Sequence, residues 1–409
     1  MKVIQLFVAV STSVVVGVSS WWWFNQPQAG FFAEYLEKPQ QTLSQIEEEL
    51  ARQLLQRITA CTQRKVRELA QQGSALDLEK LEAASIICFM EVMVLTPDRQ
   101  VAGNTEVRLT RLLNLLGVTV PQPIASGQAD IPLGKVKEAE IFTLPVQIQG
   151  KSKTFLLDTG ASASVIDEKI AAGLGLKGIP IPSQLLSYSV VGDNCDRVRA
   201  TIVPLPTLQV GTATVSGLSG LTINGVPTGS AGVLGLDFLS NYTVYLQPQR
   251  SQLRLLPRTA PPNDPNLLPL IGRMGVMVAP TQVHNRPPEL FLLDTGADVM
   301  VIGESFAQTL GIDFRTAPEI EVKGFCGIEK ARKVKLSSVQ VGTYQLTNLD
   351  AVVIRGEILQ VLGVKGIIGQ NYLNRFEQVW YFGDRNALGY PTTGHLSLTP
   401  ILPVPLSTP

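Results

Sequence analysis

The heptapeptide Phe-Leu-Leu-Asp-Thr-Gly-Ala occurs twice in the 409-residue chain, at Phe155–Ala161 and at Phe291–Ala297. Each copy carries one carboxylate, Asp158 in the first and Asp294 in the second. Two carboxyl groups held in contact cannot both ionise, so one keeps its proton and serves as an acid while the other serves as a base. The addition of water to an unactivated amide requires this pair of roles, and any titration belongs to the pair.

The residues around each aspartate fit a rigid site. Two leucines precede each aspartate and predict a buried strand, which gives the following loop the rigidity that a preorganised site needs. Gly160 and Gly296 permit a tight turn and a close backbone approach that a side chain would obstruct. The elements that position the two aspartates are therefore expected to be strands that end in tight loops.

Further matches show that the heptapeptides belong to a longer internal repeat. Asp158 and Asp294 are 136 positions apart, and three further pairs of segments follow in the same order at similar offsets. These pairs are Leu174-Gly175-Leu176 with Leu310-Gly311-Ile312, Gln209-Val210-Gly211 with Gln340-Val341-Gly342, and Gly232–Gly235 with Gly366–Gly369. The repeat predicts two copies of one β-rich fold, a first lobe at 130–256 and a second at 271–398, joined by a Pro-rich linker at 257–270.

The repeated landmarks resemble retropepsin-type aspartic proteases over roughly residues 131–398. The resemblance rests on Asp-Thr-Gly-Ala after an apolar strand, a second apolar run, a short helix that ends in Leu-Gly, and two apolar residues plus Gly before "LDFL" or "QNYL". It implies an all-β catalytic part of two closed β-barrel lobes, each contributing one aspartate to a shared dyad. It also implies that Thr159 and Thr295 brace the two loops against each other.

The resemblance implies an aspartic endopeptidase that binds a polypeptide in extended form, with Asp158 and Asp294 as the catalytic residues. Two alternatives stay open. One is an inactive peptide-binding or envelope scaffold that keeps the fold, and the other is pairing of each lobe with its counterpart in a second chain. The short linker favours pairing within the chain through effective concentration, so a monomer with an intramolecular pseudo-dimer is expected.

The second residue set that the resemblance assigns is the flap, the hairpin that folds over the cleft in this family. Its candidates are Gly192 and Cys195 in the first lobe, and Gly324 and Cys326 in the second. Both cysteines lie 14 positions before the matched Gln-Val-Gly, so they occupy equivalent positions in the repeat. They either form a disulfide across the cleft or pack separately as small apolar residues.

The region 26–125 carries no readable chemistry. Apolar residues at helical spacing predict three helices between about Phe31 and Gly117, with breaks at Gln71–Ser74 and Thr96–Asp98. An antiparallel helix pair would bring Cys61 and Cys88 together. The basic run Arg64–Arg67 is either a solvated helix face or a prosegment-like cover for an acidic site.

The first 25 residues predict a signal anchor or a cleaved signal peptide. One lysine precedes a run of about 18 mostly apolar residues, which is long enough to span a bilayer, and Trp21–Trp23 follow it as an aromatic belt would. The anchor is the preferred interpretation, because of that length and that belt. Either interpretation places the rest of the chain outside the cytoplasm, membrane-anchored or secreted.

Composition narrows the possible partners. The 34 basic residues equal the 34 acidic residues, so nothing favours a nucleic-acid partner. His284 and His395 are the only two histidines, lie far apart in sequence and are expected in loops. They predict neither a metal site nor a Ser-His-Asp set, and no cofactor is expected.

Overall fold

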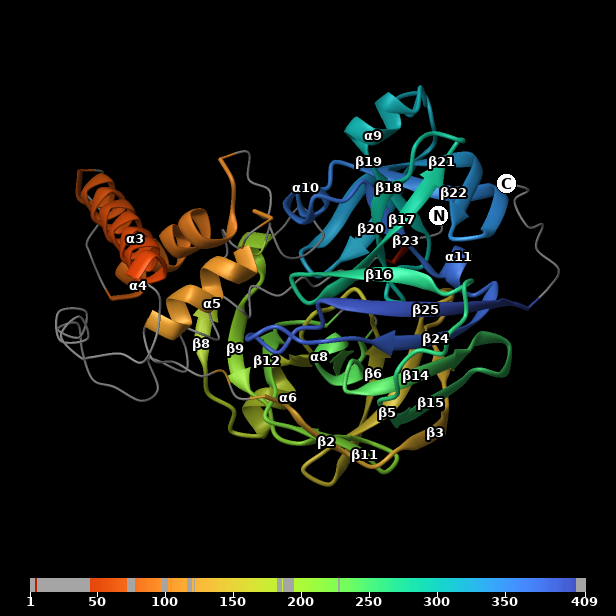
Figure 1. Ribbon diagram of the computed structural model, residues 1–409, viewed down its shortest axis with the longest axis horizontal. Coiled ribbons are helices and arrows are strands. Elements are labelled where there is room, and N and C mark those ends of the chain that lie inside the picture. Colours follow the sequence, from red (N-terminus) through yellow and green to blue (C-terminus); the bar gives the residue numbers. More distant parts are fainter. Residues whose placement is uncertain are drawn as a thin grey trace.

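The computed structural model describes residues 4–5, 45–71, 78–97, 102–103, 105–115, 120, 122–181, 186, 195–226 and 229–401. A helical region lies beside two β-rich lobes, one above the other in Figure 1, with a set of strands stacked between them. The part of the chain with the repeat is mostly β, as predicted, and forms a 14-stranded and an 11-stranded sheet.

The helical region holds α3 (Gln45–Gln71), α4 (Leu78–Phe89) continuing into the π-helix η2 (Met90–Val94), and α5 (Thr105–Leu115). Buried side chains on η2 and α5, among them Met93 and Leu109, join the hydrophobic core that extends through the lobes. The disulfide between Cys61 and Cys88 fixes α3 to α4. Lys65 of the basic run lies 3.1 Å from Glu91, so this lysine pairs within the helical region.

The described residues include Ile4–Gln5 of the predicted anchor, as strand β1, which pairs in parallel with β20 of the second lobe. The rest of the predicted anchor or signal segment lies outside the described residues. Among the helices that the structure describes, none is long and apolar enough to cross a bilayer.

The first lobe contains strands and short helices in a single run of chain. They are β2 (Ile124–Ser126), β3 (Ala129–Pro132), β4 (Gly134–Lys135), β5 (Phe142–Ile148), β6 (Lys151–Leu157), β7 (Val165–Asp167), α6 (Glu168–Gly173), β8 (Ile179–Ile181), η3 (Cys195–Arg197), β9 (Ala200–Pro204), β10 (Leu208–Val210), β11 (Ala213–Ser216), β12 (Ser219–Ile223), β13 (Gly232–Leu234), α8 (Leu236–Leu239), β14 (Tyr242–Gln247), η5 (Pro248–Arg250) and β15 (Gln252–Pro257).

The second lobe repeats this order with fewer interruptions. Its elements are β16 (Leu268–Arg273), β17 (Val276–Val283), β18 (Glu289–Leu293), β19 (Met300–Gly303), α9 (Glu304–Thr309), β20 (Glu319–Gly324), β21 (Gly327–Val341), β22 (Tyr344–Ile354), α10 (Glu357–Leu362), β23 (Gly366–Ile368), α11 (Gln370–Leu373), β24 (Phe376–Phe382) and β25 (Thr393–Pro400).

Closure differs between the two lobes. In the second lobe β17 pairs with both β18 and β21, which completes a circuit of strands through β22, β19 and β23. In the first lobe β9 pairs with β12 and β10 with β5, but β9 and β10 are two separate strands where the second lobe has the one strand β21, so the circuit is interrupted between them. Pro204 and Pro206 lie at this break, and proline has no N–H for a ladder. The expectation of two closed barrels is therefore not confirmed.

Six strands join the lobes, in the order β16, β25, β24, β14, β15 and β3 (Figure 1). At the centre β14 of the first lobe pairs with β24 of the second, with Val244 opposite Trp380. Both side chains are buried, Trp380 with 1% of its surface exposed. Because a continuous ladder crosses the junction, the two lobes of this structure pair within one chain.

Candidate active site

The two aspartates lie at equivalent strand ends. Asp158 follows β6 and Asp294 follows β18, and each of these strands runs parallel to a second buried strand, β13 or β23. The Asp158 N–H donates to Leu234 O at 3.1 Å, and the Asp294 N–H donates to Ile368 O at 3.0 Å. The Leu-Leu pairs before the aspartates are fully buried. The apolar frame of the repeat therefore anchors each loop to the core of its own lobe.

Thr159 and Thr295 connect the two loops by reciprocal hydrogen bonds. The Thr159 N–H donates to Thr295 Oγ1 at 3.0 Å, and the Thr295 N–H donates to Thr159 Oγ1 at 3.1 Å. Each hydroxyl donates in turn to the opposite strand, Thr159 Oγ1 to Leu293 O at 2.9 Å and Thr295 Oγ1 to Leu157 O at 3.1 Å. Four hydrogen bonds thus fix the loops relative to each other.

Gly160 and Gly296 allow the aspartates to approach each other. A Cβ atom on Gly160 would lie under 3.0 Å from the Asp294 carboxyl, and one on Gly296 would lie 2.5 Å from Asp158 Cγ. The Gly160 N–H donates to Asp158 Oδ1 at 2.7 Å, and the Gly296 N–H donates to Asp294 Oδ1 at 2.7 Å. Each glycine therefore orients the carboxyl of its own loop while leaving room for the carboxyl of the other.

The remaining carboxyl oxygens face the shared centre. Both aspartate side chains are completely buried, and Oδ2 of each accepts no hydrogen bond from a protein N–H or O–H of the described chain. Each carboxyl lies against the glycine of the opposite loop, so the two side chains meet where the loops of the two lobes come together. The two loops therefore bring both carboxyls into one buried site.

Burial is the main cause of a raised pKa at both aspartates. It raises the pKa of Asp158 to about 7, against opposing hydrogen bonds from Asp294 and the loop N–H groups. It raises the pKa of Asp294 well above its usual range, and the charge of Asp158 adds to this rise. One proton is therefore retained by the pair at pH values where an exposed aspartate has lost its own.

Comparison with known protein families agrees with this geometry. Residues 144–238 match the family described as "Aspartyl protease", and residues 279–375 match the family described as "gag-polyprotein putative aspartyl protease". The chain contains two aspartyl protease domains in tandem. The resemblance to retropepsins that the repeated landmarks carry is thereby confirmed, and each domain contains one of the two aspartates.

Solved structures include a retropepsin-like aspartic protease from Rickettsia conorii that is 23% identical to this chain. The match covers 32% of this chain and 90% of that one, with a TM-score of 0.22. No curated protein matches the chain.

Behind the dyad the two protease domains use different polar residues. In the first, Ser164 Oγ donates to Asp237 Oδ1 at 2.7 Å and accepts from the Gly235 N–H at 3.1 Å. In the second, Asn371 at the place of Asp237 accepts from the Met300 N–H at 2.9 Å. The sequence analysis overlooked both residues, although alignment of "GVLGLDFL" with "GIIGQNYL" places them at equivalent positions.

Gln370 is a third residue of this supporting set that the sequence patterns did not single out. Its side chain is fully buried and its Nε2 donates to Thr295 O at 2.9 Å, directly behind the dyad loop of the second domain. Leu236 occupies the equivalent position in the first domain. The sequence feature that could have identified Gln370 is a polar residue at a position where the other repeat has an apolar one.

The flap candidates are partly described. Gly324 ends β20, and Cys326 lies in the two-residue turn between β20 and β21, where Gly324 pairs with Gly327. Cys195 begins η3, and a disulfide joins it to Cys326. Of the two alternatives for these cysteines, the structure has the disulfide. Gly192 lies outside the described residues.

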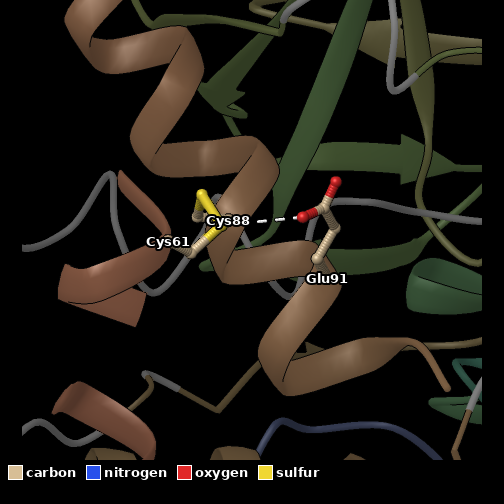
Figure 2. Close-up of side chains that lie close together, drawn as sticks. All are labelled: Cys61, Cys88 and Glu91. Atoms are coloured by element: carbon tan, nitrogen blue, oxygen red, sulfur yellow. Dashed lines mark hydrogen bonds between the residues drawn. A yellow bond between two sulfur atoms is a disulfide. The ribbon is translucent and has the colours of Figure 1, made fainter. Parts of the chain in front are cut away.

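In the part of the chain that the structure describes, Cys61, Cys88 and Glu91 form a cluster of groups of the kind that bind metals. Their potential ligand atoms lie within 4.8 Å of one another (Figure 2). The sulfurs are bonded to each other, and Cys61 Sγ lies 3.6 Å from Glu91 Oε2. A disulfide sulfur is not a thiolate, so this cluster does not offer a set of metal ligands.

The two histidines lie apart in the structure as well as in the sequence. His284 lies in the turn after β17, where its Nε2 accepts from the Ser337 N–H at 3.0 Å. His395 lies within β25 opposite Tyr381, so the expectation of a loop is wrong for this residue. It occurs in a Thr-Gly-His-Leu-Ser-Leu run whose alternation matches a strand.

Proposed function

We propose that this chain is an aspartic endopeptidase that hydrolyses polypeptides bound in extended form between its two lobes. The observation that supports it is the pair of buried carboxyls, Asp158 and Asp294, each with one oxygen fixed by a glycine N–H and the other turned to the shared centre. Membership of an aspartyl protease family supports the reaction class.

The proposed mechanism uses one water and one shared proton. Of Asp158 and Asp294, the ionised carboxylate takes a proton from the water, and the protonated carboxyl donates its proton to the carbonyl oxygen of the peptide. The oxygen of the water bonds to the carbonyl carbon. When the tetrahedral intermediate collapses, the C–N bond breaks and a proton passes to the leaving nitrogen. The products are a carboxylic acid and an amine, and the dyad regains its single proton.

A library of unstructured peptides, incubated with the full chain in detergent micelles, tests the proposal. Cleavage is expected in the unmodified protein, and either Asp158→Asn or Asp294→Asn should reduce kcat by about 10³-fold or more, since neither carboxyl replaces the other. Asp313→Asn, at an exposed aspartate outside the dyad loops, is the matched control and should keep full activity.

The outcomes separate the alternatives. Activity that survives in one of the two dyad variants would exclude a shared dyad. No cleavage by the unmodified chain between acid and neutral pH would favour the inactive peptide-binding or envelope scaffold instead.

We also propose that the protease lies outside the cytoplasm, attached to a membrane by its first 25 residues, and that it works as a monomer without a nucleic-acid partner. Two disulfides support an oxidising compartment. The full chain is expected to stay with membranes after a high-salt wash. Release of a mature chain that begins at Trp21 would instead show that the segment is a cleaved signal.

A further inference from the structure

The disulfide between Cys195 and Cys326 joins the first lobe to the tip of a hairpin of the second. The hairpin consists of β20 and β21, and its turn residues are Phe325 and Cys326. A hairpin tip is ordinarily exposed, but here Phe325 is only 4% exposed and Cys326 is completely buried. The tip is therefore packed against other parts of the protein as well as covalently tied to the first lobe.

This bond closes a ring of protein around the junction of the lobes. In the second lobe β21 of the hairpin pairs with β17, and β17 also pairs with β16 of the interlobe strands and with β18, the strand that carries Asp294. The interlobe strands connect to the first lobe through the β14–β24 ladder, and the hairpin connects to it through the disulfide. The dyad lies at the same junction and is completely buried.

We propose that the Cys195–Cys326 disulfide is a redox latch that selects which polypeptides reach the dyad. With the bond intact, a chain enters only by threading a free end through the ring. With the bond reduced, the hairpin separates from the first lobe, and an internal segment of a long or circular chain enters from the side. The inference rests on the proposed peptidase function and adds the substrate class and its control.

Opening the latch requires a dithiol reductant. A thiolate of the reductant attacks Sγ of Cys195, which is 8% exposed, whereas Cys326 is completely buried. A mixed disulfide forms and Cys326 leaves as a thiolate. The second thiol of the reductant then displaces Cys195. Two electrons and two protons pass to the cysteines, and the reductant becomes a disulfide.

The test compares a linear cysteine-free peptide of about 30 residues with its head-to-tail cyclised form, which has no end to thread and is long enough to present an extended segment. The oxidised full chain should cleave the linear form at least about tenfold faster than the cyclic form. The Cys195→Ser/Cys326→Ser variant should cleave both forms at similar rates. An unchanged ratio of the two rates would overturn the latch.

Two further samples separate the latch from general effects of cysteine loss. Cys61→Ser/Cys88→Ser removes the other disulfide and should keep the preference for the linear form. Treatment of this variant with a dithiol then reduces only the latch and should abolish the preference without any change at Cys195 or Cys326. A preference that persists after complete reduction would contradict the proposal.

Hydrogen exchange keeps the inference testable if the chain proves not to be a peptidase. On loss of the latch, amide exchange should increase at residues 319–341 and in the two dyad loops, because the hairpin would open away from them. Cleavage absent with this increase present would reject the peptidase and keep the latch. Exchange that stays unchanged in both places would reject the latch itself.

Discussion

The two lobes are alike at the loops that carry Asp158 and Asp294 and differ in the strands away from these loops. Both carry the same dyad loop, with the same hydrogen bond from the aspartate N–H to a neighbouring strand and the same reciprocal threonine contact. Away from the junction, a single 15-residue strand, β21, in the second lobe corresponds to the separate strands β9 and β10 in the first. Closure of the strand circuit is thus not needed to position an aspartate.

The polar residues behind the dyad loops also differ between the lobes, because they form their hydrogen bonds within their own lobe. Asp237 and Asn371 each contact their own lobe, so either side chain suffices if its local partners suit it. Ser164 provides a hydroxyl donor for Asp237, whereas the backbone N–H of Met300 serves Asn371. The residues of the two aspartate loops have no such freedom, because a change in one loop alters the fit of both.

Gly160→Ala and Gly296→Ala should have the largest effect, and an equal one, because each new methyl group would overlap the aspartate of the other lobe. We expect each to lower the free energy of unfolding by about 3 kcal/mol and to abolish peptide cleavage. Urea titration and a cleavage assay on the full chain measure the two effects. Gly173→Ala, where nothing lies within 4 Å of the added atom, is the control and should stay close to the unmodified protein. A large difference between the two dyad variants would show that the junction is less symmetrical than the contacts indicate.

Exchange of the two supporting residues should have a smaller and unequal effect. Asn371→Asp removes the donor that Asn371 Nδ2 directs at Asp350 O over 2.7 Å and places a carboxylate against that carbonyl. We expect a loss of about 2 kcal/mol in the free energy of unfolding, measured by urea titration at neutral pH. The exposed position Asn285 provides the control variant Asn285→Asp. If Asn371→Asp is as stable as this control, the two positions are interchangeable.

The effect of Asp237→Asn depends on pH and is expected to vanish at low pH. Burial raises the pKa of Asp237 from 3.8 to about 6, so the folded state holds this proton more tightly than the unfolded state. Stability from this source is complete below pH 3.8 and is lost as the pH rises through about 6. Asn has no such titration, so the free energy of unfolding of the variant should exceed that of the unmodified protein by up to about 3 kcal/mol at pH 7 and equal it at pH 3.5. Thermal unfolding at both pH values measures the difference, and a gap of the same size at both would exclude titration of Asp237 as its cause.

The sequence patterns predicted the two central residues of the candidate site, Asp158 and Asp294. The identical heptapeptides predicted where Asp158 and Asp294 would lie, because an apolar strand before each aspartate leaves few places for the loop. The three helices and their first break were also correct, since α3 ends at Gln71. The strand and loop patterns are local in sequence and occur in both copies of the repeat, so the prediction for one copy supports the prediction for the other.

The parts that could not be predicted depend on contacts between distant residues. The disulfide between Cys195 and Cys326 stayed one of two alternatives, because equivalent positions in a repeat need not touch. The break between β9 and β10 depends on Pro204 and Pro206, which the strand pattern did not weigh. The role of Gln370 could not be predicted, because its hydrogen bond to Thr295 O joins residues that are far apart in the sequence.

The β14–β24 ladder determines when the two lobes can assemble during synthesis. Val244 pairs with Trp380, so the β14–β24 ladder cannot form before Trp380 has been synthesised. Until then no ladder holds the loop of Asp294 against the loop of Asp158. The hydrolytic activity that we propose would therefore begin only after the strands of both lobes that form this ladder have been made.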